Sequence, residues 1–350
     1  MTASATAPAV AGRMCPRDYR YAPSVFKRPA ELRAEVLYVV GGLYGNLGAL
    51  DAIEHLAAAE SGPVTIVFNG DFHWFDAEPG WFAAIDERVA RHPALRGNIE
   101  TEIARRDDIG AGCGCAYPDN VAGNVVQWSN AIQAALRDAA PPDRTARLGA
   151  LPMHFVAAVG GLRIGIVHGD ATSLAGWDFA HDRLADPARR AGLPALRDAS
   201  AVDVFASTHT CLAALCDVAG ESRLTVINNG AAGMPNFAGT RFGVITRIAT
   251  RPAPHPPLYG LTRDGVAIDA VAVRYDTDAF LRDFLARWPE GSPAHRSYLR
   301  RIMQGPDHAI EAASSAVILR CEGEARASKE DGAASFGRIL RGPPLAAASG

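Results

Sequence analysis

Continuous apolar stretches alternate with amphipathic ones along the first part of the chain. Residues 35–40, EVLYVV, form a short apolar run typical of a buried strand. The stretch NLGALDAIEHLAAA at 46–59 repeats apolar residues at helical spacing, and PVTIVFNGD at 63–71 is a second apolar run that ends in Asn-Gly-Asp. This pattern predicts a strand–helix–strand unit whose parallel strands are covered on both faces.

The same alternation continues toward the carboxyl terminus. Helices are expected over 81–92 and 123–139, and two strands within 154–170 are expected to join at Gly160 and Gly161. A helical stretch at about 178–198 precedes short β-type runs at 202–210, 223–230, 241–249 and 266–274. A clear amphipathic helix follows over 277–288, with Thr277 as its expected N-cap. The pattern predicts an α/β (α+β) protein whose ligand loops lie at the carboxyl ends of its strands.

Composition divides the chain into four parts. Residues 1–33, rich in Ala, Pro and Arg, are expected to form an extension that packs loosely on a domain of residues 34–276. Residues 277–310 are expected to add a helical segment, and the Ala, Ser, Gly and Pro of 311–350 indicate a flexible tail.

Charge and cysteine content narrow the partners and the compartment. The formal net charge of −3 gives no basic surface for nucleic acid or an anionic membrane, and the longest apolar runs are too short to cross a bilayer. We therefore expect no nucleic-acid or membrane partner, with a cytoplasmic location as the default. The 6 cysteines are too few for a disulfide framework, so we expect mostly reduced thiols.

Polar residues that bind metals end four of the predicted strands or follow them directly. Asp71 ends FNGD, Asn98 ends LRGN, His168 lies in IVHGD and His209 lies in STHT. Each alone is also explained as a turn former or a buried, hydrogen-bonded histidine. Together, one carboxylate, one amide oxygen and two imidazoles form a donor set suited to Mn, Fe or Zn.

The order of these turns resembles that of the calcineurin-like metallophosphoesterase family. GNLGAL, NGD, RGN, IVHGD, THT and INNGAAGMP, over roughly residues 36–248, follow the family's blocks DxHGN, GDxxD, GNHE, HG, GHTH and a final Asn-Pro-Gly-Ser-type turn. The resemblance implies a sandwich of two mixed sheets that holds two metal ions and hydrolyses phosphate esters. It further implies that Asp71 bridges the two metals, that Asn98 and His168 bind the second metal, and that His209 binds the first.

The chain departs from the family pattern at four positions. Gly42 and Tyr44 stand where the first block has its Asp and His ligands, Ile99 replaces a histidine that contacts the phosphate, and Ser207 replaces the first histidine of GHTH. The first metal would keep two ligands and the second metal three. One divalent ion is therefore expected rather than two.

Several other residues are candidates for roles near this site. His73 lies two residues after Asp71 and is a candidate relocated ligand or catalytic residue; the alternative is that it turns away. Tyr44, Asn46 and Trp177 are candidates for substrate binding. The Cys113-Gly114-Cys115 motif lacks the repeated CxxC spacing of a structural zinc site, so packing or substrate contact is expected.

Two functions follow from this sequence. The first is a metal-dependent phosphoesterase in which metal-activated water attacks a small phosphorylated substrate, with Asp71 and His168 at the catalytic centre. The alternative is a catalytically inactive protein that keeps the same fold as a binding or regulatory module. The four surviving ligands favour the first, and the four departures favour the second.

Overall fold

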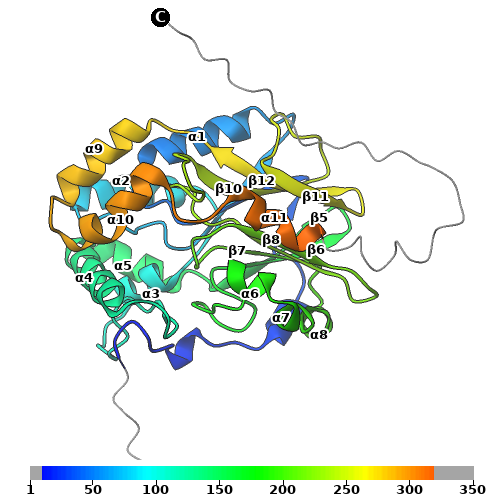
Figure 1. Cartoon of the computed structure of the whole chain (residues 1–350), viewed down its shortest axis with the longest axis horizontal. Coiled ribbons are helices and arrows are strands. Elements are labelled where there is room, and N and C mark those ends of the chain that lie inside the picture. Colours follow the sequence, from blue (N-terminus) through cyan, green and yellow to red (C-terminus); the bar gives the residue numbers. More distant parts are fainter. Residues whose placement is uncertain (1–9, 319–350) are drawn as a thin grey trace, which may run out of the picture. The chain divides into compact units, whose positions relative to one another are not determined.

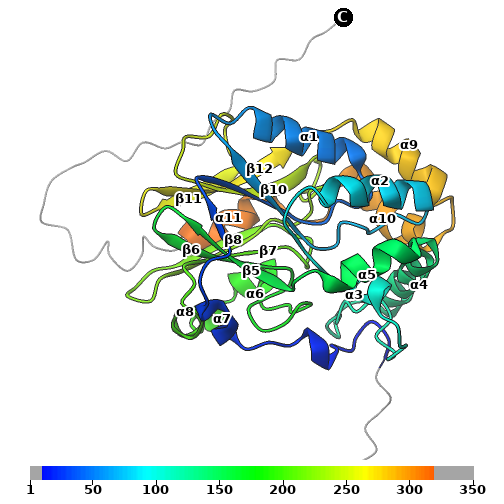
Figure 2. The same ribbon diagram turned by 180° about the vertical axis from the view of Figure 1, so that it is seen from behind.

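Two six-stranded mixed sheets face each other in the computed structural model, which describes residues 10–318 (Figures 1 and 2). The first sheet has the order β11 (Tyr259–Arg263), β12 (Val266–Val273), β10 (Gly243–Ala249), β2 (Val36–Val40), β3 (Val64–Asn69), β4 (Ala94–Leu95). The second has the order β1 (Leu32–Ala34), β5 (His154–Val159), β6 (Leu162–Val167), β7 (Val204–Ser207), β9 (Leu224–Asn228), β8 (Ala214–Val218).

Alternating side chains along the strands build three apolar layers. Leu37 and Val39 of β2 point into the layer between the sheets, where they meet a cluster that includes Ile164 and Ile227 of the second sheet. The remaining apolar side chains of β2 contact the helices that cover the outer face of the first sheet. All five residues of β2 are buried, as its continuous apolar sequence predicts.

Helices cover the outer faces of both sheets. The first sheet is covered by α1 (Leu47–Ala58), α2 (Pro79–Val89), α9 (Thr277–Arg287) and α10 (Pro293–Gln304), and α3 (Asn98–Ala104), α4 (Gly123–Ala139) and α5 (Pro142–Ala150) extend this layer beyond β4 (Figure 1). The second sheet is covered by the 3₁₀ helix η2 (Pro23–Lys27), α6 (His181–Ala185), α7 (Pro187–Arg190) and α8 (Leu193–Ser200) (Figure 2). A shorter 3₁₀ helix, η1 (Arg17–Tyr19), precedes η2.

Parallel pairing brings the strand-end turns to one edge. β2, β3 and β4 run parallel in the first sheet, and β6, β7 and β9 run parallel in the second. At this edge the two sheets touch, because Gly42 after β2 forms a parallel bridge with Ala231 after β9. The turns that carry Asp71, Asn98, His168 and His209 therefore meet between the sheets.

Some sequence expectations need correction. Residues 10–33 do not pack loosely, because Tyr19 and Phe26 are fully buried and β1 joins the second sheet. Asp276, not Thr277, caps α9, since its carboxylate accepts hydrogen bonds from the backbone N–H groups of Asp278 and Ala279. Residues 310–318, placed largely in the expected tail, form the helix α11 (Ile310–Ile318); the rest of that tail lies outside the described residues.

Candidate metal centre

Four candidate ligand atoms converge at the strand ends. The Nε2 atom of His168 lies 3.2 Å from Oδ2 of Asp71, 3.1 Å from Oδ1 of Asn98 and 3.2 Å from Nδ1 of His209. Among the described residues, Asp71, His168 and His209 form a group of potential ligands whose atoms lie within 4.8 Å of one another. The structure thus brings together all four residues that the sequence named as metal ligands.

Hydrogen bonds on the far side of each histidine ring determine which of its nitrogens has a free lone pair facing the cluster. Nδ1 of His168 lies 2.8 Å from the carbonyl oxygen of Asn69, and Nε2 of His209 lies 3.1 Å from that of Cys115. A carbonyl oxygen only accepts hydrogen bonds, so the ring nitrogen that faces it carries the proton. In each neutral ring the other nitrogen, which faces the cluster, therefore has a free lone pair.

Asn98 is oriented in the same way. Its Nδ2 donates to the carbonyl oxygen of Cys113 at 2.9 Å, which leaves Oδ1 facing His168. With the Asp71 carboxylate, and while both rings are neutral, four hydrogen-bond acceptors then face one another. Two oxygen and two nitrogen atoms in this arrangement are suited to bind a divalent Mn, Fe or Zn ion, whose positive charge would stabilise all four.

The pKa values of the two histidines diverge in the absence of an ion. Burial lowers the pKa of His168, but the adjacent Asp71 carboxylate outweighs it and raises this pKa above its usual range. Burial and the neighbouring His168 lower the pKa of His209 to about 3.

Glu100 is a buried residue that holds the turn of Asp71 and was missed from the sequence. Its carboxylate accepts hydrogen bonds from the backbone N–H groups of Asp71 at 2.8 Å, of Gly97 at 2.8 Å and of His73 at 3.2 Å. Asp71 has a positive φ of 54°, a conformation that costs energy for a residue with a side chain. Glu100 stabilises this turn. It could have been found in the sequence as the fourth residue of GNIE, which matches the family block GNHE.

His73 does not join the cluster. Its Nδ1 lies 2.8 Å from Oδ2 of Asp76 and its Nε2 lies 3.3 Å from Oδ1 of Asp86, so both ring nitrogens face other carboxylates. The ring also stacks on Phe82 with centroids 3.7 Å apart. The hypothesis that His73 is a relocated ligand or catalytic residue is wrong for this geometry.

The positions of the missing first-block ligands are filled by an aromatic ring. A Cβ built on Gly42 would lie 2.6 Å from Cε2 of Tyr44, so the ring takes the space of a side chain at position 42. Tyr44 itself turns its hydroxyl to Sγ of Cys211 and not to the ligand cluster. Ser207 Oγ is buried and has no hydrogen-bond partner within the described part of the chain.

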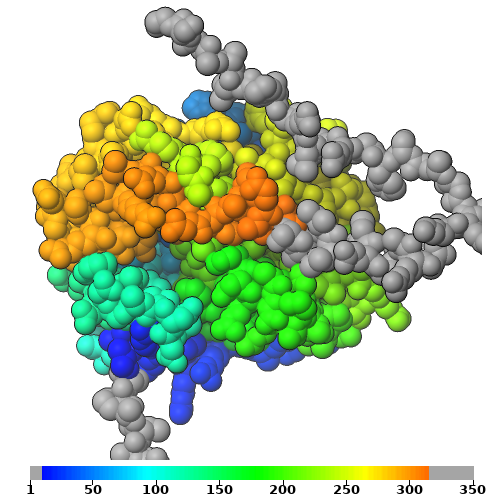
Figure 3. Space-filling model, viewed as in Figure 1, coloured from blue at the N-terminus to red at the C-terminus, as the bar shows by residue number. Residues whose placement is uncertain are grey.

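A cavity of about 160 Å³ opens beside the candidate ligands. Tyr44 and Trp177 line it, as do Tyr298 and Arg301 of α10, which crosses this face in orange in Figure 3. Asn46 does not line it: its side chain caps α1 through the N–H of Ala49 and donates to the carbonyl oxygen of Gly233. Of the three proposed substrate-binding residues, the structure places Tyr44 and Trp177 at the cavity and Asn46 away from it.

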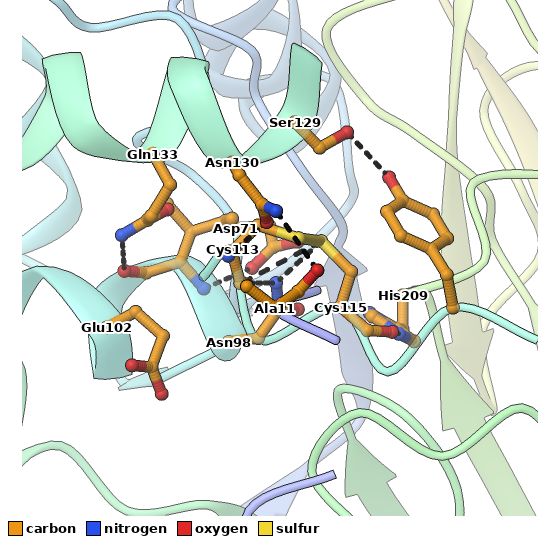
Figure 4. Close-up of a disulfide and its surroundings, with 12 residues drawn as sticks. Ala11, Asp71, Asn98, Glu102, Cys113, Cys115, Ser129, Asn130, Gln133 and His209 are labelled. Carbon is orange, nitrogen blue, oxygen red and sulfur yellow. Dashed lines mark hydrogen bonds between the residues drawn. A yellow bond between two sulfur atoms is a disulfide. The ribbon is translucent and has the colours of Figure 1, made fainter. Parts of the chain in front are cut away.

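Cys113 and Cys115 form a disulfide beside the site (Figure 4). Cys15, Cys211 and Cys216 are free thiols, so most of the described cysteines are reduced, as expected, and the Cys113–Cys115 pair is the departure. Cys115 lines the cavity, in agreement with the expected position of this loop.

Neither a protein-family model nor a curated protein matches the chain. A hypothetical protein from Pyrococcus horikoshii OT3 is similar in structure, with a TM-score of 0.52 and 16% sequence identity over 78% of this chain and 99% of that one. A metallophosphoesterase from Sphaerobacter thermophilus gives a TM-score of 0.46 and 16% identity over 77% and 100% of the two chains. Vps29 from Chaetomium thermophilum gives 0.30 and 14% over 69% and 100%.

The chain has the calcineurin-like metallophosphoesterase fold. Its two facing mixed sheets, with strand-end turns that meet between them, form the sandwich that the sequence resemblance implies, and the Pyrococcus structure shares this arrangement. Among residues 10–318, no helix is both long and apolar enough to span a membrane.

Proposed function

We propose that this protein is a phosphoesterase that uses one divalent metal ion to hydrolyse a small phosphorylated substrate. The observation that carries the proposal is the convergence of Asp71, Asn98 and His209 on Nε2 of His168, with every outer polar atom of the three neutral side chains bound to a carbonyl oxygen. Four acceptors held together in this way are stabilised by a cation.

One ion is proposed because the neighbouring half-site lacks ligands. Gly42 has no side chain, and the Tyr44 ring fills the adjacent space while its hydroxyl faces Cys211. When bound, a divalent ion lowers the pKa of a coordinated water toward about 7 and polarises a phosphoryl oxygen.

The chain's own residues supply the surroundings of the reacting phosphate. Arg301 is the one guanidinium that residues 10–318 contribute to the cavity lining, where it is held by the carbonyl oxygens of Pro235 and Cys211. We assign it to binding the phosphate charge. The rings of Tyr44, Trp177 and Tyr298 exclude water from the rest of the cavity, which strengthens these electrostatic contacts.

The proposal is tested on protein stripped of metal and reloaded with Mn, Fe or Zn. Metal content is measured, and hydrolysis of an aryl phosphomonoester and an aryl phosphodiester is followed. We expect Asp71→Asn and His168→Ala each to lower both metal content and turnover by at least about 10-fold, as the loss of a direct ligand requires. His55→Ala, at an exposed histidine on α1, is the matched control and is expected to change neither. Turnover that persists unchanged in both ligand variants would refute the proposal.

A metal-binding module without turnover is the second candidate function. Ile99 stands where the family has a histidine that contacts the phosphate, so the chain lacks that imidazole for the reaction. The second candidate predicts that wild-type protein retains the ion, that Asp71→Asn and His168→Ala lose it, and that neither ester is hydrolysed. The same experiment therefore separates the two.

A further inference from the structure

The loop that carries Cys113 and Cys115 supports two candidate ligands from opposite sheets. The Cys113 carbonyl oxygen accepts a hydrogen bond from Nδ2 of Asn98 at 2.9 Å, and the Cys115 carbonyl oxygen accepts one from Nε2 of His209 at 3.1 Å (Figure 4). Asn98 begins α3 after the first sheet, whereas His209 follows β7 of the second. Two carbonyl groups of one loop, two residues apart in sequence, therefore fix the orientation of both ligands.

The same loop also positions the cavity wall. The Cys115 carbonyl oxygen accepts a second hydrogen bond, from Nε1 of Trp177 at 3.0 Å. Nδ2 of Asn98 lies 3.6 Å from Sγ of Cys115, so the disulfide itself touches a candidate ligand. A rotation of the Cys115 peptide would move His209 and Trp177 together.

The backbone of this loop needs a constraint to keep its shape. Gly112, Gly114 and Ala116 all have positive φ angles, of 61°, 65° and 50°. This conformation is unfavourable for Ala116, which carries a Cβ. The Cys113–Cys115 bond joins the residues on either side of Gly114 and closes a ring that contains the Cys113 carbonyl group and the Cα atom that carries the Cys115 carbonyl group.

We infer that Cys113 and Cys115 are positioning residues whose disulfide sets the affinity of the centre for a divalent ion, and that reduction of this disulfide by a small thiol weakens that affinity. The inference rests on the proposed function only in taking the centre to be a metal site. Loss of the cross-link frees the two carbonyl groups to turn, which removes the fixed orientation of Asn98 and His209.

The reduction is an ordinary thiol–disulfide exchange with the small thiol as reductant. A thiolate attacks Sγ of Cys115, the bond between the cysteines breaks and Cys113 leaves as a thiolate that takes up a proton. A second thiolate then attacks the sulfur of the first thiol in the mixed disulfide, which releases a symmetrical small disulfide and the Cys115 thiolate. Two electrons pass from the two small thiols to the cysteine pair.

The cavity gives the small thiol its route. Cys115 lines the cavity and is 6% exposed, whereas Cys113 is fully buried. Attack is therefore expected at Cys115, with Cys113 as the leaving sulfur.

The test compares the affinity for Mn²⁺ of oxidised protein and of protein reduced with dithiothreitol, then desalted under argon. Free Mn²⁺ is measured by electron paramagnetic resonance, so no turnover is needed. We expect about 10- to 100-fold weaker binding after reduction, the range for loss of groups that orient ligands. The affinity should return on reoxidation. Nitrogen-15 spectra of the metal-free protein should show the His209 imidazole changing with reduction.

Two variants sharpen the test. Cys113→Ser/Cys115→Ser is expected to bind Mn²⁺ as weakly as the reduced protein and to ignore reductant. Cys216→Ser, at a buried free thiol on β8, should keep the full response. Should the double variant fail to fold, the reduced wild-type protein answers the same question. Equal affinities in both redox states, or alkylation of Cys113 and Cys115 without prior reduction, would overturn the inference.

The outcome is separable from that of the proposed function. Redox-dependent Mn²⁺ binding without ester hydrolysis supports the inference and refutes the phosphoesterase. Hydrolysis with an affinity that ignores the redox state supports the phosphoesterase and refutes the inference.

Discussion

Gly42 and Tyr44 stand where the family pattern has two metal ligands, and they act as a pair. A ligand side chain at position 42 would need the space of the Tyr44 ring, since a Cβ there would lie 2.6 Å from Cε2 of Tyr44. The ring is buried and packs on Phe75 and Tyr298, with centroids 5.4 Å and 6.2 Å away. Restoring position 42 alone therefore leaves the obstruction in place.

The number of bound ions should respond to both positions together. Gly42→Asp/Tyr44→His replaces the obstructing ring and supplies two family ligands, so we expect bound Mn to rise from about one to about two ions per chain. Metal content is measured by mass spectrometry after dialysis. Gly42→Asp alone is the matched control and is expected to stay at about one ion. A double variant that still binds a single ion would show that Gly42 and Tyr44 do not limit the site.

At the scale of helices and strands, the ends of the strands could be predicted from the sequence. The directions of side chains in the turns that follow the strands could not. Continuous apolar runs such as that of β2 follow from burial on both faces, and parallel pairing then brings Asp71 and His168 together. The prediction for His73 is wrong because β3 ends at Asn69. Asp71 and His73 therefore lie in a turn, where side chains two residues apart no longer point to the same side. The helix α3 was missed because its buried face includes Glu100 and Glu102, which bind Asp71 and Tyr19, two residues far away in sequence.

Asp86 joins α2 to α5 through a network centred on its own buried carboxylate. Its carboxylate meets His73 at 3.3 Å, Arg144 at 2.9 Å and Arg147, while its side chain is 3% exposed. Burial acts to raise its pKa, but the hydrogen bonds from His73 and Arg144 outweigh it and lower the pKa to about 2. A lowered pKa stabilises the fold at pH values above the unfolded pKa of about 3.9, and this stabilisation is lost as the pH falls toward about 2.

Asp86→Asn should therefore cost stability in a pH-dependent way. We expect a loss of about 2–3 kcal/mol in the free energy of unfolding at pH 7, because the pKa is lowered by about two units at about 1.4 kcal/mol per unit. The difference from wild type should shrink between about pH 4 and pH 2, as measured by urea unfolding at several pH values. Glu87→Gln, at the exposed neighbour that also pairs with Arg144, is expected to cost less than about 0.5 kcal/mol at pH 7. A loss that stays constant down to pH 2 would contradict the role of the Asp86 charge.

On the scale of the whole molecule, the amino-terminal segment ties distant parts of the chain together. Tyr19 is fully buried, and its hydroxyl donates to Glu102 of α3 at 2.6 Å. Its carbonyl oxygen accepts from the backbone N–H of Leu174, beyond the second sheet strand β6. Sequence patterns report local periodicity, so contacts across 83 residues, as between Tyr19 and Glu102, leave no local signal.

Removal of one hydroxyl tests whether this segment stabilises the folded domain. Tyr19→Phe keeps the buried ring but leaves the buried Glu102 without one donor, so the free energy of unfolding should fall by about 1–3 kcal/mol. Urea unfolding followed by circular dichroism measures the loss. Tyr259→Phe is the matched control, because the Tyr259 hydroxyl is buried and has no hydrogen-bond partner among residues 10–318. Its loss should leave the stability unchanged or slightly higher. Equal effects of the two substitutions would mean that the bond to Glu102 adds no stability, and that the segment is held by apolar contacts and backbone hydrogen bonds alone.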